Sequence, residues 1–159
     1  MDDRGWTVTA FDINRVAIAN VTQRAVRHFG SMYKLRGEIS TDDACKYAYP
    51  SEEFDLVVAY GLYHCLDDER LALVHGGIVQ ALKSGGLLAF ATFNDTLPVP
   101  ENHGTDDLVL RPPEHIFDIA AADFDLLDRE VGRIDEVHPP LTVSHSHGLT
   151  WGLFRKKAG

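Results

Sequence analysis

Two acidic residues stand where strands of the chain are expected to end. Asp12 closes the aromatic and β-branched stretch 5–12, and Asp43 with Ala44 lies after a weaker strand candidate at 32–39. A carboxylate at a strand end can accept hydrogen bonds from ribose hydroxyls or from an adenine amine. A helix cap explains Asp12 equally well, and a solvated acidic loop explains Asp43, so neither residue alone identifies a nucleotide site.

A second group of candidates follows the apolar stretch 54–60. Tyr60, Tyr63 and His64 lie just beyond it, and an imidazole has a pKa suited to a catalytic base near neutral pH. The alternative is that Tyr63 packs in the core and His64 is a partly exposed loop residue. Asn94 and Asp95 follow the next apolar stretch, where they either contact a ligand or cap the strand end.

Histidines near the C-terminus raise the question of a metal. His145 and His147 are two residues apart and would share one face of a strand, with His138 further away. Two imidazoles on one face can hold a metal ion, but no third ligand stands at a defined spacing. We therefore expect no metal site, and a histidine facing the substrate is the better expectation.

The elements that would position these residues alternate between strand and helix. Asn14 can cap a helix whose apolar residues recur at helical spacing, and Asp67 or Asp68 can cap another. Two final strands, 124–137 and 148–155, lack room for a crossover helix and should pair antiparallel. The expected fold is an open, mostly parallel α/β sheet with helices on both faces and a C-terminal antiparallel hairpin. Other expected elements are the apolar helix stripe Leu71, Val74, Ile78 and Leu82, a strand at 87–93 and a helix at 112–122.

Two further segments carry specific expectations. Residues 54–60 are apolar on both faces after Asp55, as strands inside a parallel sheet are. Residues 94–110 have no periodicity, and loops of this length are usually functional. Because ligands of such sheets bind beyond the carboxyl ends of the strands, the candidate residues above stand where a site is expected.

Composition limits the class of protein. The 159 residues suit one domain, spanning 1–159, and the excess of 24 acidic over 15 basic residues gives a net charge of −9. That charge disfavours nucleic acid and anionic membranes as partners, and favours a small molecule. No apolar run is long enough to span a bilayer, the N-terminus lacks the pattern of a secretory signal, and two cysteines form no disulfide framework. We expect a cytoplasmic protein.

Two motifs in combination point to a family. Phe54-Asp55-Leu56-Val57, followed at a distance by Leu82-Lys83-Ser84-Gly85-Gly86, resembles the class I S-adenosylmethionine-dependent methyltransferases, which have a Rossmann-like fold. The resemblance covers nearly the whole chain and departs in the second motif only by Ser84 for proline. It implies a methyltransferase that uses S-adenosylmethionine. By the same resemblance, the cofactor-binding residues are Asp12, Ile13, Asp43, Ala44 and Tyr60, and the catalytic candidates are His64 and Tyr63.

One element of that family has no counterpart in the sequence. The family's first strand and its Gly-x-Gly-x-Gly loop are missing, so about one strand–helix unit, roughly 30 residues, is absent before Gly5. Three explanations stay open. Strands 6–12 and 54–60 pair directly, a partner chain or a second copy donates the strand, or the sequence begins downstream of the true start.

These explanations lead to two functional expectations. The first is a small-molecule methyltransferase whose cofactor site a partner chain or a longer N-terminus completes. The alternative is a non-catalytic methyltransferase-like subunit that serves in dimerisation or regulation. A nicotinamide-dependent oxidoreductase is a distant third, because it too needs the missing glycine loop.

Overall fold

The computed structural model describes residues 6–29, 37–99, 108–137 and 143–158. His138 and part of the loop 94–110, both singled out from the sequence, lie outside these residues. The chain divides into two compact units, residues 1–48 (unit 1) and 49–159 (unit 2). Whether the chain acts as the single domain expected from its length stays a prediction.

Unit 1 is built on two short parallel strands joined through a helix. Phe11 pairs with Ser40, so both strands end at the same edge of this small sheet. The Asn14 side chain accepts hydrogen bonds from the backbone N–H groups of Val16, at 2.9 Å, and Ala17, at 3.3 Å. This confirms the expected helix cap. The elements of unit 1 are β1 (Val8–Phe11), α1 (Arg15–Phe29) and β2 (Gly37–Ser40).

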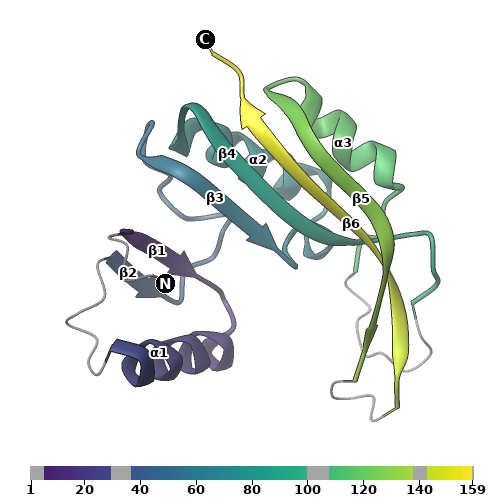
Figure 1. Ribbon diagram of the computed structural model, residues 1–159, viewed down its shortest axis with the longest axis horizontal. Coiled ribbons are helices and arrows are strands. Elements are labelled where there is room, and N and C mark those ends of the chain that lie inside the picture. The colour runs from purple at the N-terminus through teal and green to yellow at the C-terminus, as the bar shows by residue number, and fades with distance from the viewer. Residues whose placement is uncertain (1–5, 30–36, 100–107, 138–142, 159) are drawn as a thin grey trace. The chain divides into compact units, whose positions relative to one another are not determined.

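Unit 2 contains a four-stranded sheet in the order β3-β4-β6-β5 (Figure 1). β3 and β4 are parallel, whereas β6 runs antiparallel to both of its neighbours, β4 and β5. The expected C-terminal hairpin is therefore confirmed, with β5 ending one residue before the expected end and β6 longer than expected at both ends. The elements of unit 2 are β3 (Phe54–Tyr60), the 3-10 turn η2 (Tyr63–Cys65), α2 (Asp68–Ala81), β4 (Leu82–Asn94), α3 (Pro113–Ala121), β5 (Phe124–Glu136) and β6 (His145–Lys156).

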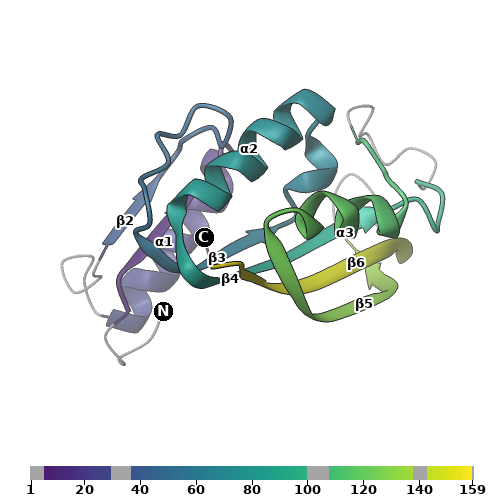
Figure 2. The same ribbon diagram turned by 90° about the horizontal axis from the view of Figure 1, so that it is seen from above.

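Both helices of unit 2 pack on the same face of its sheet (Figure 2). An aromatic cluster joins them to the strands: Phe117 of α3 lies 6.2 Å from the rings of Phe90 and Phe154, and Phe124 touches both Phe154 and His75 of α2. Asp67 caps α2 by accepting a hydrogen bond from the backbone N–H of residue 70 at 2.8 Å. All four members of the expected apolar stripe are buried: Leu71, Val74, Ile78 and Leu82.

The face of β3 that is turned away from the helices of unit 2 is more exposed than the sequence led us to expect. β3 is an edge strand of its sheet in the described part of the chain, and Val58 and Tyr60 are 64% and 70% exposed because both helices of unit 2 pack on the other face. The expectation that residues 54–60 lie inside the sheet is therefore wrong for these residues. β1 and β3 belong to separate sheets in separate units, and the explanation in which these two strands pair directly stays a prediction.

Close packing holds α2 at one of its two glycines. A Cβ on Gly77 would lie 2.3 Å from Cδ2 of Tyr49, whereas a Cβ on Gly76 would meet nothing within 4 Å. Gln80 adds a 2.7 Å hydrogen bond from its Nε2 to the carbonyl oxygen of Tyr49. Lys83 lies in β4 and forms an ion pair with Asp55, with Nζ 2.8 Å from Oδ1. None of the described helices is long and apolar enough to cross a membrane.

Candidate functional site

Asp12 lies at the carboxyl edge of the β1–β2 sheet. Its backbone N–H continues the ladder to the carbonyl oxygen of Ser40 at 3.4 Å, and its Oδ1 accepts a 2.7 Å hydrogen bond from the N–H of Asn14. The carboxylate is exposed, and the second oxygen has no hydrogen-bond partner among the described residues. The side chain thus shapes the turn into α1 with one oxygen and leaves the other exposed. Ile13, next in the chain, is 71% exposed.

Asp43 belongs to the loop that leaves the same edge. Its Oδ1 accepts a 2.9 Å hydrogen bond from the N–H of Cys45, and its Oδ2 lies 3.7 Å from Nζ of Lys46. Because β1 and β2 are parallel and in register at their last residues, the loops that carry Asp12 and Asp43 leave the sheet side by side. Ala44 is half-buried within this loop. The structure therefore brings the four residues predicted in this unit to one sheet edge.

An aromatic pair that sequence reasoning missed supports this edge. The rings of Phe11 and Tyr47 stack with centroids 4.4 Å apart, joining the end of β1 to the end of the Asp43 loop. The stack joins two residues that lie far apart in the sequence, and residue spacing gives no signal for it, so only the folded chain reveals it. It fixes the loop, since the backbone N–H of Tyr47 also donates to the carbonyl oxygen of Asp43 at 2.9 Å.

In unit 2, Tyr60 ends β3 and its ring is mostly exposed. Gly61 follows with a φ of +69°, and its N–H donates to the carbonyl oxygen of Ala91 at 2.8 Å. This turn redirects the chain at the carboxyl end of β3, where ligands of parallel sheets bind. The ring of Tyr60 is thus exposed at this end of β3.

Tyr63 is a core residue. It is 2% exposed, stacks on Phe90 at 5.5 Å, and its hydroxyl lies 3.3 Å from Nδ1 of His75. Burial raises the pKa of the Tyr63 hydroxyl far above its ordinary value, so it stays protonated. The predicted catalytic role for Tyr63 is therefore corrected, because a side chain enclosed among core aromatics cannot reach a substrate.

His64 is also buried, at 6% exposed, and its Nδ1 accepts a 3.0 Å hydrogen bond from the backbone N–H of Phe93. Thr92 Oγ1 lies 3.0 Å from the same nitrogen. Burial first, and the charge of His147 second, lower the pKa of His64 to about 4. The ring is neutral at pH 7 with its proton on Nε2. The predicted role as a general base is corrected to that of a hydrogen-bonded anchor between η2 and the end of β4, because its accepting nitrogen is already used.

Arg111 holds the segment around these residues and was not foreseen. It is 5% exposed, and its guanidinium donates to the carbonyl oxygens of Tyr63 (3.2 Å) and Leu66 (2.8 Å) and to the carboxylate of Asp68. An isolated arginine before two prolines carries no sequence signal for such a role. It positions the backbone that follows β3.

Asn94 likewise proves structural. It is 1% exposed, its Nδ2 donates to Oγ1 of Thr150 at 3.0 Å, and its Oδ1 accepts from the N–H of Thr96 at 2.9 Å. Capping of the strand end, the alternative considered from the sequence, describes Asn94 correctly. Asp95 is exposed, and its backbone N–H donates to the carbonyl oxygen of Arg111 at 3.2 Å.

Comparison with known proteins gives a consistent picture. A family model described as a methyltransferase domain matches residues 1–86. No curated protein sequence matches the chain significantly. Among solved structures, a S-adenosylmethionine-dependent methyltransferase from Methanosarcina mazei is similar with a TM-score of 0.74 and 16% identity, over 98% of this chain and 84% of that one.

Two further structures are similar in fold. The N-methyltransferase NodS from Bradyrhizobium japonicum WM9, in complex with S-adenosyl-L-homocysteine, has a TM-score of 0.66 and 18% identity, over 96% of this chain and 67% of its own. The cyclase SpnF has a TM-score of 0.67 and 19% identity, over 99% and 69%. Identities this low establish the fold, which is the Rossmann-like α/β fold that the sequence led us to expect.

Proposed function

Because this chain belongs to the methyltransferase domain family, we propose that it binds S-adenosylmethionine and transfers the methyl group to a small molecule. The observation that carries the proposal is the placement of Asp12 and Asp43 at one edge of the β1–β2 sheet, inside the range that the family model matches.

The residues of this edge fit a nucleoside. The unengaged oxygen of Asp12 can accept hydrogen bonds from ribose hydroxyls, while Asn14 keeps the other oxygen oriented. Asp43 can accept from the adenine amine, and the apolar side chains of Ile13 and Ala44 can cover the ring. Both carboxylates are already oriented by backbone N–H groups, which lowers the entropic cost of binding.

Tyr60, the cofactor-binding residue expected in unit 2, stays a prediction, and its ring at the end of β3 is exposed. S-adenosylmethionine supplies an electrophilic methyl group on a sulfonium. The acceptor's lone pair forms a bond to that carbon as the carbon–sulfur bond breaks and its electrons stay on sulfur. The protein's contribution to such a displacement is alignment, and no residue of the described chain needs to become covalently modified.

Direct titration of the cofactor tests the proposal. We expect the full chain to bind S-adenosylmethionine and S-adenosyl-L-homocysteine with one site in calorimetry. Asp12→Asn keeps an oxygen for the N–H of Asn14 but removes the charge, so binding should weaken by about 10- to 100-fold. Glu38→Gln, an exposed carboxylate of β2, makes the same charge change and should leave affinity unaltered.

Two results would overturn the proposal. One is no binding of either compound by the full chain, which would leave the non-catalytic methyltransferase-like subunit as the better interpretation. The other is equal loss of affinity in Asp12→Asn and Glu38→Gln, which would mean that general electrostatics and not the strand-end carboxylate is responsible. The small-molecule acceptor is supported only by the acidic net charge of −9, and screening candidate nucleophiles for methyl transfer would identify it.

A further inference from the structure

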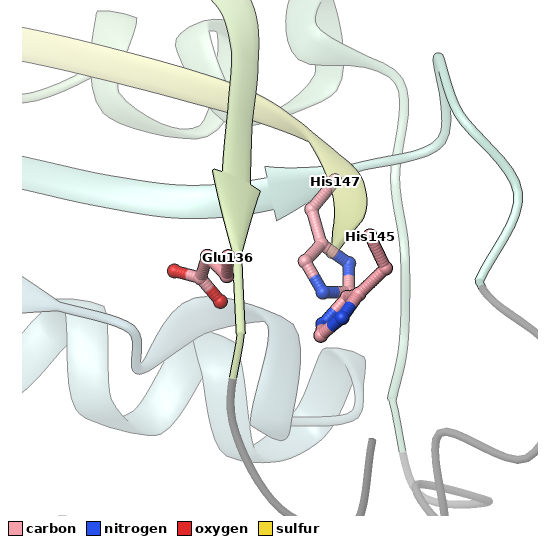
Figure 3. Close-up of side chains that lie close together, drawn as sticks. All are labelled: Glu136, His145 and His147. Carbon is pink, nitrogen blue, oxygen red and sulfur yellow. The ribbon is translucent and has the colours of Figure 1, made fainter. Parts of the chain in front are cut away.

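Three side chains with metal-ligating atoms meet at one end of the β5–β6 hairpin (Figure 3). Glu136 ends β5, while His145 begins β6 and His147 follows two residues later. One ligand atom from each side chain lies within 4.8 Å of the other two. This cluster uses none of the residues proposed to bind the nucleoside.

The pairing of the two strands brings the carboxylate to the histidines. Glu136 lies directly opposite His145, and His147 is on the same face as His145 because side chains alternate along a strand. A bulge near Leu127 shifts the register, so that Leu126 pairs with Phe154 but Asp128 pairs with Leu153. Plain alternation from Phe124 would have placed Glu136 on the helix-covered face. The bulge turns it to the face that carries the two histidines.

The two imidazoles are held in place by packing. His147 is 3% exposed and stacks on Phe93 with ring centroids 4.2 Å apart. His145 is 9% exposed and meets the His147 ring edge-on, at 5.0 Å and 90°. Little side-chain entropy is left to lose when such rings bind an ion, which is the condition for a preorganised site.

The backbone also selects the tautomer of His145. Its Nδ1 lies 3.2 Å from the carbonyl oxygen of Val143. A neutral ring that donates its Nδ1–H to this oxygen keeps its lone pair on Nε2. Histidines that bind metals characteristically donate their other ring N–H to a carbonyl or a carboxylate in this way.

From this arrangement we infer that Glu136, His145 and His147 form a binding site for a divalent transition-metal ion of the Zn²⁺ class. Two imidazole nitrogens and one carboxylate oxygen suit zinc, whereas magnesium and calcium prefer oxygen ligands throughout. Three protein ligands leave a fourth tetrahedral position for water or for an oxygen or nitrogen of a bound molecule.

The geometry requires a modest closure around the ion. Ligand atoms of a tetrahedral zinc lie about 3.3 Å apart, given bonds of about 2.0 Å, so separations of up to 4.8 Å must shorten by as much as about 1.5 Å. Glu136 is at the end of its strand and only partly buried, so its side-chain torsions can bring the carboxylate closer to the histidines, whereas any shortening between the two imidazoles requires the rings themselves to turn. A Glu–His ion pair with no metal is the alternative that the experiment must exclude.

The test is metal binding by the full chain after removal of metals with a chelator. We expect calorimetry with Zn²⁺ to show one saturable site, and Co²⁺ to give the intense visible absorption of a tetrahedral ion with nitrogen and oxygen ligands. His147→Ala and Glu136→Gln should each weaken Zn²⁺ binding by about 100-fold, since the first removes a ligand and the second replaces the charged carboxylate by a neutral amide that binds zinc poorly. Glu136→Gln changes only one terminal group, so it keeps the test valid if the alanine variant fails to fold.

One matched control is a glutamate from the same strand as Glu136, and the other is a histidine from α3. Glu130→Gln removes an exposed carboxylate from β5, and His115→Asn removes an exposed imidazole from α3, and neither should change Zn²⁺ affinity. Absence of a saturable site, or Zn²⁺ binding that survives Glu136→Gln and His147→Ala unchanged, would overturn the inference. The outcome is independent of cofactor titration, because the two sites share no residue.

Discussion

The guanidinium of Arg111 donates two hydrogen bonds, from Nη2 at 2.8 Å and from Nε at 3.1 Å, to the same carboxylate oxygen of Asp68. The two partners are unequal, because Arg111 is buried while the side chain of Asp68 is 85% exposed. Arg111 holds the pKa of the Asp68 carboxyl below its usual range, chiefly through these hydrogen bonds. The stabilising role of the pair therefore belongs to the arginine and its buried carbonyl partners.

Replacing Arg111 should be far more damaging than replacing Asp68. Arg111→Met leaves the carbonyl oxygen of Leu66 without its donor and leaves that of Tyr63 with only the N–H of Leu66, so we expect a loss of about 1–3 kcal/mol in the free energy of unfolding. Asp68→Asn keeps an oxygen for the guanidinium and should change little. Denaturant titration checks both variants, and equal effects would contradict this assignment.

The two adjacent glycines of α2 should respond oppositely to alanine. Gly76→Ala meets no neighbouring atom and should stabilise the protein by about 1 kcal/mol through helix propensity. Gly77→Ala forces its methyl group into the Tyr49 ring and should destabilise it by about 1–3 kcal/mol. Thermal and denaturant unfolding measure the difference. Stabilisation by both substitutions would show that Tyr49 does not pack on this helix in solution.

His64 should make stability depend on pH in the acid range. Its pKa is lowered to about 4 by burial and by His147, whereas the unfolded chain has the ordinary value near 6.5. Between these values the unfolded state binds more protons, so stability is full above pH 6.5 and falls as the pH drops toward 4. The loss from this group is on the order of 3 kcal/mol, at 1.36 kcal/mol per unit.

A variant isolates this contribution. His64→Asn retains an oxygen acceptor for the backbone N–H of Phe93 and cannot be protonated, so its unfolding free energy should vary less between pH 7 and 4. His75, whose pKa is also lowered by burial, supplies a remaining slope in both proteins. An unchanged pH profile in His64→Asn would contradict the buried neutral imidazole.

Tyr63→Phe tests the reassignment of Tyr63 to the core. The substitution removes a hydroxyl that faces His75 and should lower the free energy of unfolding by about 1 kcal/mol. Affinity for S-adenosylmethionine, measured by calorimetry, should stay within about two-fold, because 0.4 kcal/mol or less is expected from a residue that touches no ligand. A large loss of affinity without a loss of stability would restore the residue to the site.

Much of the fold could be predicted because its signals are local. The caps at Asn14 and Asp67 and the apolar stripe of α2 follow from residue types at fixed spacing, and all were confirmed. The burial of residues 54–60 was not predictable in the same way. Their apolar pattern shows that both faces could be buried, whereas the exposure of Val58 and Tyr60 depends on which face of the sheet the helices of unit 2 cover.

The residues of the candidate site were likewise predictable where their signals are local and not where they depend on long-range contacts. Strand-end carboxylates such as Asp12 follow from where a strand stops. The roles of Tyr63 and Arg111 depend on contacts between segments far apart in sequence, where single-chain patterns carry no information. Glu136 could not be recognised from the sequence as a third ligand beside the two histidines. One extra residue interrupts the alternation along β5, and no composition signal marks its position.

This bulge divides β5 into two segments, and the alternation of side chains between the two faces of the sheet restarts after it. Before Leu127, the side chain of Phe124 faces the aromatic core. After Leu127, the even-numbered residues up to Glu136 face the opposite surface of the sheet. A substitution in either segment leaves the alternation of side chains in the other unchanged. A single insertion or deletion between the bulge and Glu136 would instead move the side chains beyond it to the opposite face of the sheet. Sequence drift at this end of the protein should therefore proceed by substitution, with length between Asp128 and Glu136 held constant.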